Sequence, residues 1–189
     1  LSPSGTTSDN DLLVAAMSND PGQTICYTLD GTTPTCNGGI CTGTTQTYNA
    51  ASRIAINGMV TDSVTGTVTV SAIGCIAGAT NSSPTTQTYT LRADPPTMTD
   101  PAPSTTLDAD AGPVAPTLSS GTMSSLSPAN PVVIRTTTDS ATAPTCATGI
   151  ANDPGTTVPI TGNTTIQAMT CKTGYLPSAV VTFDYAFGP

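Results

Sequence analysis

The chain has 189 residues, and at about 100–150 residues per domain this length allows one large domain or two small ones. It contains no histidine, which excludes histidine general bases, histidine metal ligands and Ser-His-Asp or Cys-His catalytic arrangements. Only four cations accompany a net charge of −8, which excludes the clustered basic surface that nucleic acid or an anionic membrane requires.

Threonine dominates the composition, with 40 threonines and 17 serines. The branched β-carbon of threonine suits a pleated strand, whereas glutamate is absent and lysine and arginine are too rare to favour helices. With 17 glycines and 17 prolines to form turns, the sequence predicts an all-β protein. The alternative is a disordered stalk rich in Ser, Thr and Pro, but the hydrophobic residues fall in alternating runs that a stalk does not need.

The expected strands are short and are separated by turn signals. In the first half of the chain they cover residues 12–17, 24–29, 53–56, 67–73 and 85–91, and in the second half residues 131–137, 164–169 and 180–187. Residues 67–72 alternate with the period of two that a half-buried strand requires. Asp30-Gly31 and Asn57-Gly58 are strong turn signals. This series of short strands predicts small β-sandwiches.

The chain contains two unequal copies of one sequence unit. Residues 72–78 and 168–174 share the pattern A-φ-x-C-x-x-G, in which φ is an apolar residue. At the same distance after each cysteine comes a tyrosine inside an expected strand, Tyr89 in the first copy and Tyr185 in the second. A second match, T-x-P-T-C, lies upstream, and its different offset gives the first copy about 14 extra residues.

These copies predict the domain organisation. We expect two small Ig-like antiparallel β-sandwich domains in tandem, stapled by disulfides, one in residues 1–92 and one in residues 113–189. Residues 93–112 between them are rich in proline and aspartate, which predicts a semi-rigid, extended linker.

Six cysteines, an even number in a chain with few charges, predict disulfides and an oxidising compartment. The alternative, a zinc site, needs close pairs such as C-x-x-C, and the closest pair here, Cys36 and Cys41, is spaced more widely. The chain starts at Leu1 without a methionine or a charged leader, as a mature exported segment does, although a cut fragment would look the same. The expected location is therefore extracellular or at the cell surface.

The repeat predicts which cysteines pair. The second copy has only Cys146 and Cys171, and if these two pair, the aligned Cys36 and Cys75 of the first copy should pair as well. Cys26 and Cys41 then form the third disulfide. The alignment supports this division, because Cys26 aligns with Thr136 and Cys41 has no counterpart in the second copy.

Residues 25–35 read I-C-Y-T-L-D-G-T-T-P-T, which resembles the small β-sandwich unit named after the C-terminal domain of chitobiase and β-hexosaminidase. Residues 137–144 of the second copy depart from the motif, since they lack its D-G pair, but residues 168–174 followed by Tyr175 keep the later A-I-A/G-C-K-x-G pattern better. The resemblance implies an Ig-like sandwich that accompanies other domains in exported bacterial proteins. It does not imply hydrolysis, which in those enzymes belongs to a separate barrel domain.

Few residues are candidates for catalysis, metal binding or ligand binding, and we expect neither an enzyme nor a cofactor. The carboxylates are all aspartates, mostly in turns and in the expected linker. Asp9-Asn10-Asp11 and Asp108-Ala109-Asp110 offer oxygen atoms to Ca²⁺, but neither has an EF-hand pattern, so we expect no metal site. Most aromatic residues occupy strand positions, and only Tyr48 and Tyr175 look free to contact a glycan.

These observations favour a non-catalytic extracellular structural or interaction protein, a self-assembling subunit of a filament or fibre. A charge-poor surface suits close packing of copies, and exposed sheet edges can accept a strand from a neighbour. The most apolar run near a terminus could pair within the first copy or with the next subunit; its residues are Leu12, Leu13, Val14, Ala15, Ala16 and Met17. The alternative is a carbohydrate- or surface-binding accessory module of a larger secreted protein. The expected partners are thus copies of the chain or a polysaccharide, without nucleic acid or membrane insertion.

Overall fold

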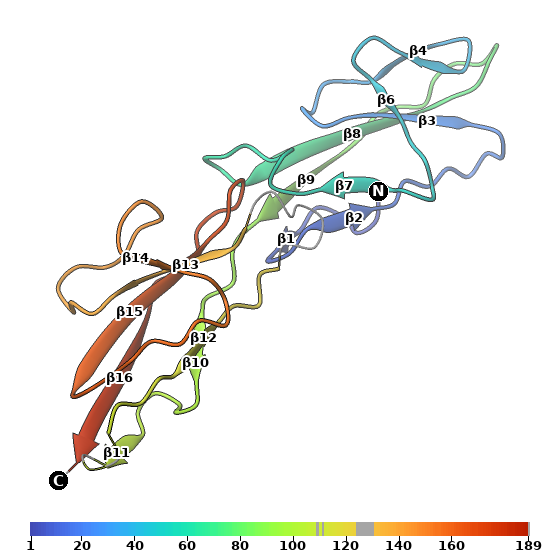
Figure 1. The fold of residues 1–189 in the computed structure, drawn as a ribbon. Coiled ribbons are helices and arrows are strands. Elements are labelled where there is room, and N and C mark those ends of the chain that lie inside the picture. Colours follow the sequence, from blue (N-terminus) through green and yellow to red (C-terminus); the bar gives the residue numbers. More distant parts are fainter. Residues whose placement is uncertain (109, 111, 124–130, 189) are drawn as a thin grey trace.

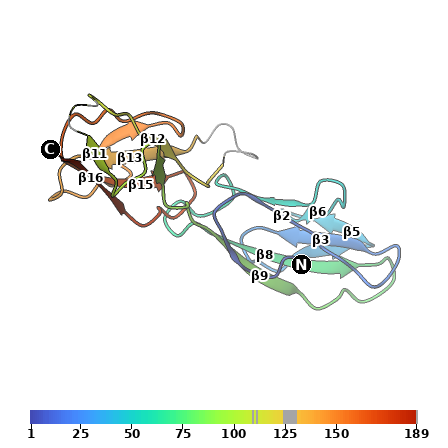
Figure 2. The same cartoon turned by 90° about the horizontal axis from the view of Figure 1, so that it is seen from below.

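The structure, a computed structural model, describes residues 1–108, 110, 112–123 and 131–188. In this part of the chain there are sixteen strands and no α-helix, which confirms the predicted all-β class. Two groups of strands lie end to end and give an elongated molecule, as Figures 1 and 2 show from two directions. Among the described residues, no helix has the length and apolar character that crossing a membrane requires.

The first domain is built on a five-stranded sheet in the order β1-β9-β8-β3-β6. Its strands are β1 (Thr7–Ser8), β3 (Thr24–Thr28), β6 (Gln46–Thr47), β8 (Thr67–Cys75) and β9 (Thr85–Leu91). Two shorter antiparallel pairs accompany it, β2 (Leu12–Val14) with β7 (Ile54–Ile56) and β4 (Thr35–Asn37) with β5 (Ile40–Thr42).

Alternating side chains bring these strands together. Val68 and Val70 of β8 and Tyr89 and Leu91 of β9 face inward, against the inward face of the β2–β7 pair. The resulting core consists of Val14, Tyr27, Ile54, Ile56, Val68, Val70, Ala72, Tyr89, Leu91 and, from far along the chain, Tyr175. At about 25 cal/mol per Å² of buried apolar surface, such inward rows supply most of the stabilisation available to a small sheet.

The second domain repeats this arrangement with a sheet in the order β11-β16-β15-β13-β14. Its strands are β11 (Thr106–Asp108), β13 (Val133–Thr137), β14 (Ile150–Asn152), β15 (Thr164–Cys171) and β16 (Val181–Gly188). β10 (Thr97–Thr99) pairs with β12 (Thr117–Ser119) beside it. The core comprises Met98, Leu118, Ile134, Ile160, Ile166, Ala168, Phe183 and Tyr185.

The described residues between 93 and 112 do not form the linker that their composition predicts. Two of their segments are strands: β10 pairs with β12, and β11 is the edge strand of the second sheet, paired in parallel with β16. An edge strand needs hydrogen bonds on one side only, so a short Thr-Leu-Asp segment between prolines suffices. The linker prediction is therefore wrong, and the second domain begins close to the end of β9.

The sheets also differ from the expected antiparallel form at one edge each. β1 pairs with β9 in parallel, as β11 does with β16, while the other strand pairs of both sheets are antiparallel. Just upstream of each parallel edge strand, a proline carbonyl accepts a tyrosine hydroxyl. Tyr89 donates to Pro3 O at 2.8 Å, and Tyr185 donates to Pro101 O at 3.1 Å. The Ig-like character of the domains stays a prediction.

Candidate functional site

The most elaborate arrangement of polar residues lies where the two domains meet. The segment after β15 leaves the second sheet and runs along the end of the first. Leu176 N donates to Leu91 O at 2.8 Å, and Ala93 N donates to Leu176 O at 2.8 Å, so Arg92 and Leu176 form a parallel bridge. Backbone hydrogen bonds thus join the end of β9 to the second domain.

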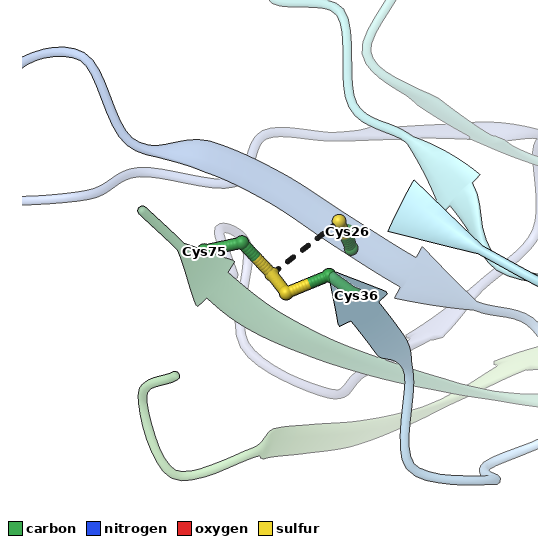
Figure 3. Close-up of side chains that lie close together, drawn as sticks. All are labelled: Cys26, Cys36 and Cys75. Atoms are coloured by element: carbon green, nitrogen blue, oxygen red, sulfur yellow. Dashed lines mark hydrogen bonds between the residues drawn. A yellow bond between two sulfur atoms is a disulfide. The ribbon is translucent and has the colours of Figure 1, made fainter. Parts of the chain in front are cut away.

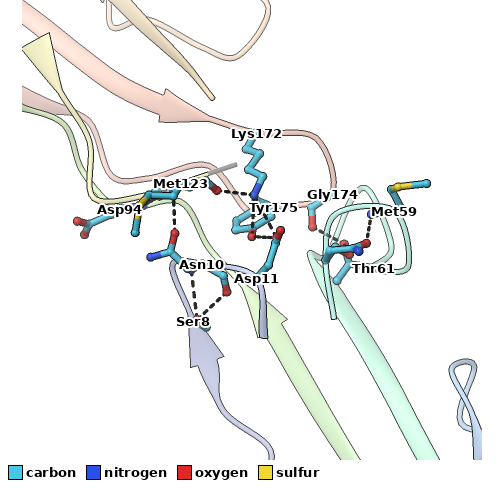
Figure 4. Close-up of polar contacts among 12 residues, drawn as sticks. Ser8, Asn10, Asp11, Met59, Thr61, Asp94, Met123, Lys172, Gly174 and Tyr175 are labelled. Carbon is cyan, nitrogen blue, oxygen red and sulfur yellow. Dashed lines mark hydrogen bonds and ion pairs between the residues drawn. The ribbon is translucent and has the colours of Figure 1, made fainter. Parts of the chain in front are cut away.

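A buried ion pair lies next to this bridge (Figure 4). Lys172 Nζ is 3.1 Å from Asp11 Oδ1, and neither side chain is exposed to solvent. The ammonium also donates to Met123 O at 2.7 Å and to Tyr175 Oη at 3.0 Å. Its three protons therefore have three acceptors. This matters because a buried charge without partners costs several kcal/mol.

Tyr175 connects the ion pair to the core of the first domain. Its hydroxyl donates to Asp11 Oδ1, its ring packs in the first core, and Lys172 Nζ lies 4.2 Å from the ring centroid. Burial raises the pKa of the Tyr175 hydroxyl, and the hydrogen bond to Asp11 and the charges of Asp11 and Asp9 raise it further. The phenol therefore keeps its proton and remains a donor to Asp11.

The loop after β7 supplies a second contact between the domains. Thr61 Oγ1 donates to Gly174 O, and Thr61 is buried. Gly174 has a φ of 76°, and a β-carbon there would lie 2.1 Å from Gly58 O. Only glycine combines this backbone conformation with such a close approach. The loop thus lies against the turn that carries Lys172.

Asn10 makes a third contact between the domains. Its Nδ2 donates to Gly121 O at 3.2 Å, and its Oδ1 accepts from Met123 N at 2.6 Å. Together these contacts close the junction around the ion pair. Because the ammonium is saturated and shielded from water, the arrangement is suited to fixing one domain on the other.

The structure confirms the three predicted disulfides. The Cα–Cα distances are 5.6 Å for Cys26–Cys41, 6.5 Å for Cys36–Cys75 and 5.7 Å for Cys146–Cys171, all within the usual range. Together these pairs use all six cysteines.

One detail of the alignment behind the pairing is wrong. Cys26 lies opposite Ile73 in the first sheet, and the residue in the corresponding place of the second sheet is Arg135, opposite Met169. The sequence alignment had placed Thr136 there. A shift of one residue reverses the face of a strand, and Thr136 is in fact buried on the core side while Arg135 lies on the outer face.

Of the two tyrosines expected to contact a glycan, one is buried and the other is partly exposed. Tyr175 is 4 % exposed and belongs to the junction, so a glycan contact there is wrong. Tyr48 is half-buried against the first core. No sequence signal marked Tyr175 for burial, because its neighbour in space, Asp11, lies 164 residues away in the chain.

The apolar run from Leu12 to Met17 pairs within its own domain. Leu12, Leu13 and Val14 form β2 and pair with β7, and Ala15 exchanges two hydrogen bonds of 2.8 Å with Ser2. Ala16 is buried, while Met17 is 78 % exposed. Of the two options drawn from the sequence, the structure of the single chain shows pairing within the first copy. Donation of this strand to a neighbouring subunit stays a prediction.

Two of the four aspartates considered for calcium have other partners. Asp11 pairs with Lys172, and Asp108 Oδ1 accepts from Asp110 N at 2.9 Å. Within the described part of the chain, the one cluster of at least three metal-ligating side chains is Cys26, Cys36 and Cys75, all in disulfides.

No protein-family model matches the chain, and a search of curated proteins finds no match either. The resemblance to the C-terminal domain of chitobiase therefore remains a prediction from the motif in residues 25–35.

Proposed function

We propose that the protein is a non-catalytic extracellular structural protein whose two disulfide-stapled domains form one rigid unit that assembles with copies of itself into a filament or fibre. The observation that carries this proposal is the buried junction around Lys172 and Asp11. Domains of one chain usually move relative to each other unless a large and hydrophobic interface holds them together. Here a shielded ion pair, a backbone bridge and a core tyrosine are shared across the interface, which supports rigidity.

The surface composition supports packing between copies. Charged residues make up only 8 % of the chain, so few charges must lose their water when copies pack together. Three disulfides fit an oxidising, exported compartment, and they strengthen small domains that have no tryptophan and two phenylalanines. The two domains are, in this proposal, repeats of one structural unit.

In this proposal, assembly uses a surface other than the segment 12–17, which is paired within the chain. Other large apolar side chains are exposed, and Ile40, at the tip of the β4–β5 hairpin, is 69 % exposed. This hairpin lies at the end of the first domain that is remote from the second (Figure 1). A contact there would join subunits end to end, as a filament requires.

Electron microscopy of the protein from its native source, without reducing agent, tests the proposal. Regular filaments, fibres or sheets are expected, and dispersed particles at high concentration would contradict self-assembly. Ile40→Asp should abolish assembly if the hairpin tip is the contact. Ile150→Asp is the matched control, because Ile150 is 64 % exposed and lies in the second domain.

A further inference from the structure

Four cysteine sulfurs converge on the outer face of the first sheet. The disulfides Cys26–Cys41 and Cys36–Cys75 lie side by side, and Cys26 Sγ is 3.6 Å from Cys75 Sγ. The sulfurs of Cys26, Cys36 and Cys75 all lie within 4.8 Å of one another. Figure 3 shows the three side chains close together. The fourth sulfur, that of Cys41, is bonded to Cys26.

Two structural elements bring the sulfurs together. Cys26 and Cys75 are diagonal neighbours on adjacent strands, because Cys26 lies opposite Ile73 and Cys75 lies opposite Thr24. Cys36 and Cys41 lie directly opposite each other in the β4–β5 hairpin. The sheet therefore supplies two sulfurs and the hairpin above it supplies two more.

We propose that, when these two disulfides are reduced, the four thiolates of Cys26, Cys36, Cys41 and Cys75 form a tetrahedral Zn²⁺ site. Zinc binds cysteine sulfur at about 2.3 Å, and tetrahedral geometry then separates the sulfurs by about 3.8 Å. The sulfurs of Cys26 and Cys75 already have nearly this separation. Reduction frees the two bonded pairs to move apart to the same distance.

The surroundings suit a structural metal. Cys26 and Cys75 are buried in one cluster with Ile73, and Cys36 and Cys41 are partly exposed. The buried Cys26 and Cys75 place one side of the site in apolar surroundings. The partly exposed Cys36 and Cys41 leave the other side open for the ion to enter. The second domain has no equivalent site, because it has only Cys146 and Cys171 and carries Arg135 in the place of Cys26.

Zinc binding and disulfide formation exclude each other. Oxidation of the four thiolates yields two disulfides and releases four electrons and one Zn²⁺. A small-molecule disulfide accepts these electrons: two such molecules take up four protons and leave as four thiols. The chain would thus hold zinc while reduced and release it on entering an oxidising compartment.

Cobalt titration of the full chain tests the site. The protein is reduced with a phosphine without oxygen, freed of the phosphine, and titrated with Co²⁺ as a spectroscopic substitute for Zn²⁺. The expected result is saturation at one equivalent with the visible absorption of tetrahedral cobalt–thiolate, lost when Zn²⁺ is added. Cys146→Ser/Cys171→Ser should retain this spectrum, and Cys26→Ser/Cys41→Ser should lose it. An unchanged spectrum in the latter variant, or none in the wild type, would overturn the proposal.

Thiol alkylation of the wild-type chain makes the test independent of how the variants fold. Zn²⁺ should protect the four cysteines of the first domain from alkylation in the reduced chain and leave Cys146 and Cys171 reactive. Mass spectrometry of the digested protein reads each cysteine separately. Equal alkylation of all six cysteines in the presence of Zn²⁺ would refute the site.

Discussion

Gly174 of the second domain lies directly against the backbone of Gly58 in the first. A β-carbon on Gly174 would lie 2.1 Å from Gly58 O and 2.4 Å from Gly58 Cα. Gly78 provides the comparison, because it lies in the corresponding turn of the first domain. It has the same φ of 76°, and a β-carbon on it would have no atom of the described residues within 4 Å. A comparison of substitutions at Gly174 and Gly78 therefore separates the effect of the contact between domains from the effect of the backbone conformation.

Gly174→Ala should open the junction, and Gly78→Ala should not. Both variants place alanine in the left-handed region, which costs about 1–2 kcal/mol. Only Gly174→Ala adds a clash with backbone atoms, so it should lose more stability and separate the domains. Urea unfolding gives the stability, and small-angle X-ray scattering gives the radius of gyration, which should rise for Gly174→Ala alone. Equal behaviour of the two variants would show that the contact does not hold the domains.

Removing one partner of the buried ion pair should be costly. Asp11→Ala leaves the Lys172 ammonium buried without its carboxylate, and such a loss typically costs about 3–5 kcal/mol. Asp11→Ala/Lys172→Met should recover part of this loss, since the unpaired charge is gone. Denaturant unfolding of both variants measures the difference. Asp20→Ala, which removes an exposed aspartate, is the control. A loss for Asp11→Ala no larger than for the control would contradict the role of the pair.

The sequence was sufficient for the fold class and the disulfides, because both depend on local pattern or on comparison of the two copies. Thr-rich alternation predicts strands, and the absence of two cysteines from the second copy selects one pairing out of fifteen. The junction between the domains could not be predicted from the sequence. Asp11 and Lys172 are 161 residues apart, and nothing in the sequence around either residue indicates that they meet.

The linker prediction failed for a different reason. Proline and aspartate are typical of extended linkers, but they are also tolerated beside short edge strands. β11 contributes only three residues to the second sheet, too few to show alternation. A signal for β11 is present in the two copies, because Ser2-Pro3 precedes β1 much as Asp100-Pro101 precedes β11.

Acid should destabilise the protein through three aspartates in turns. Hydrogen bonds lower the pKa of each carboxyl below its ordinary value of 3.8: from the Thr32 side chain for Asp30, from Thr65 N for Asp62 and from Ala141 N for Asp139. The unfolded chain therefore takes up protons first as the pH falls. The stabilisation is complete above about pH 5 and is lost progressively as the pH falls below it.

Urea unfolding between pH 5 and about pH 2 measures this effect. The midpoint should fall with pH in the wild type and fall less in Asp62→Asn/Asp139→Asn, because an amide does not titrate there. Asp20→Asn removes an exposed charge and serves as the control. An acid response of the double variant as steep as that of the control would exclude these turns as its source.

The tyrosine–proline contacts should contribute similarly to the two domains. Tyr89→Phe and Tyr185→Phe each remove one hydroxyl whose acceptor is a proline carbonyl beside a parallel edge strand. A hydrogen bond of this kind contributes about 0.5–1.5 kcal/mol, and the ring itself stays in place to fill the core. Each variant should therefore lose about that much stability. Hydrogen exchange should show the loss first at β1 in Tyr89→Phe and at β11 in Tyr185→Phe, since these hydroxyls hold the segments that lead into those strands. If exchange rose equally in both domains of either variant, the contact would act on the whole molecule and not on its own edge strand.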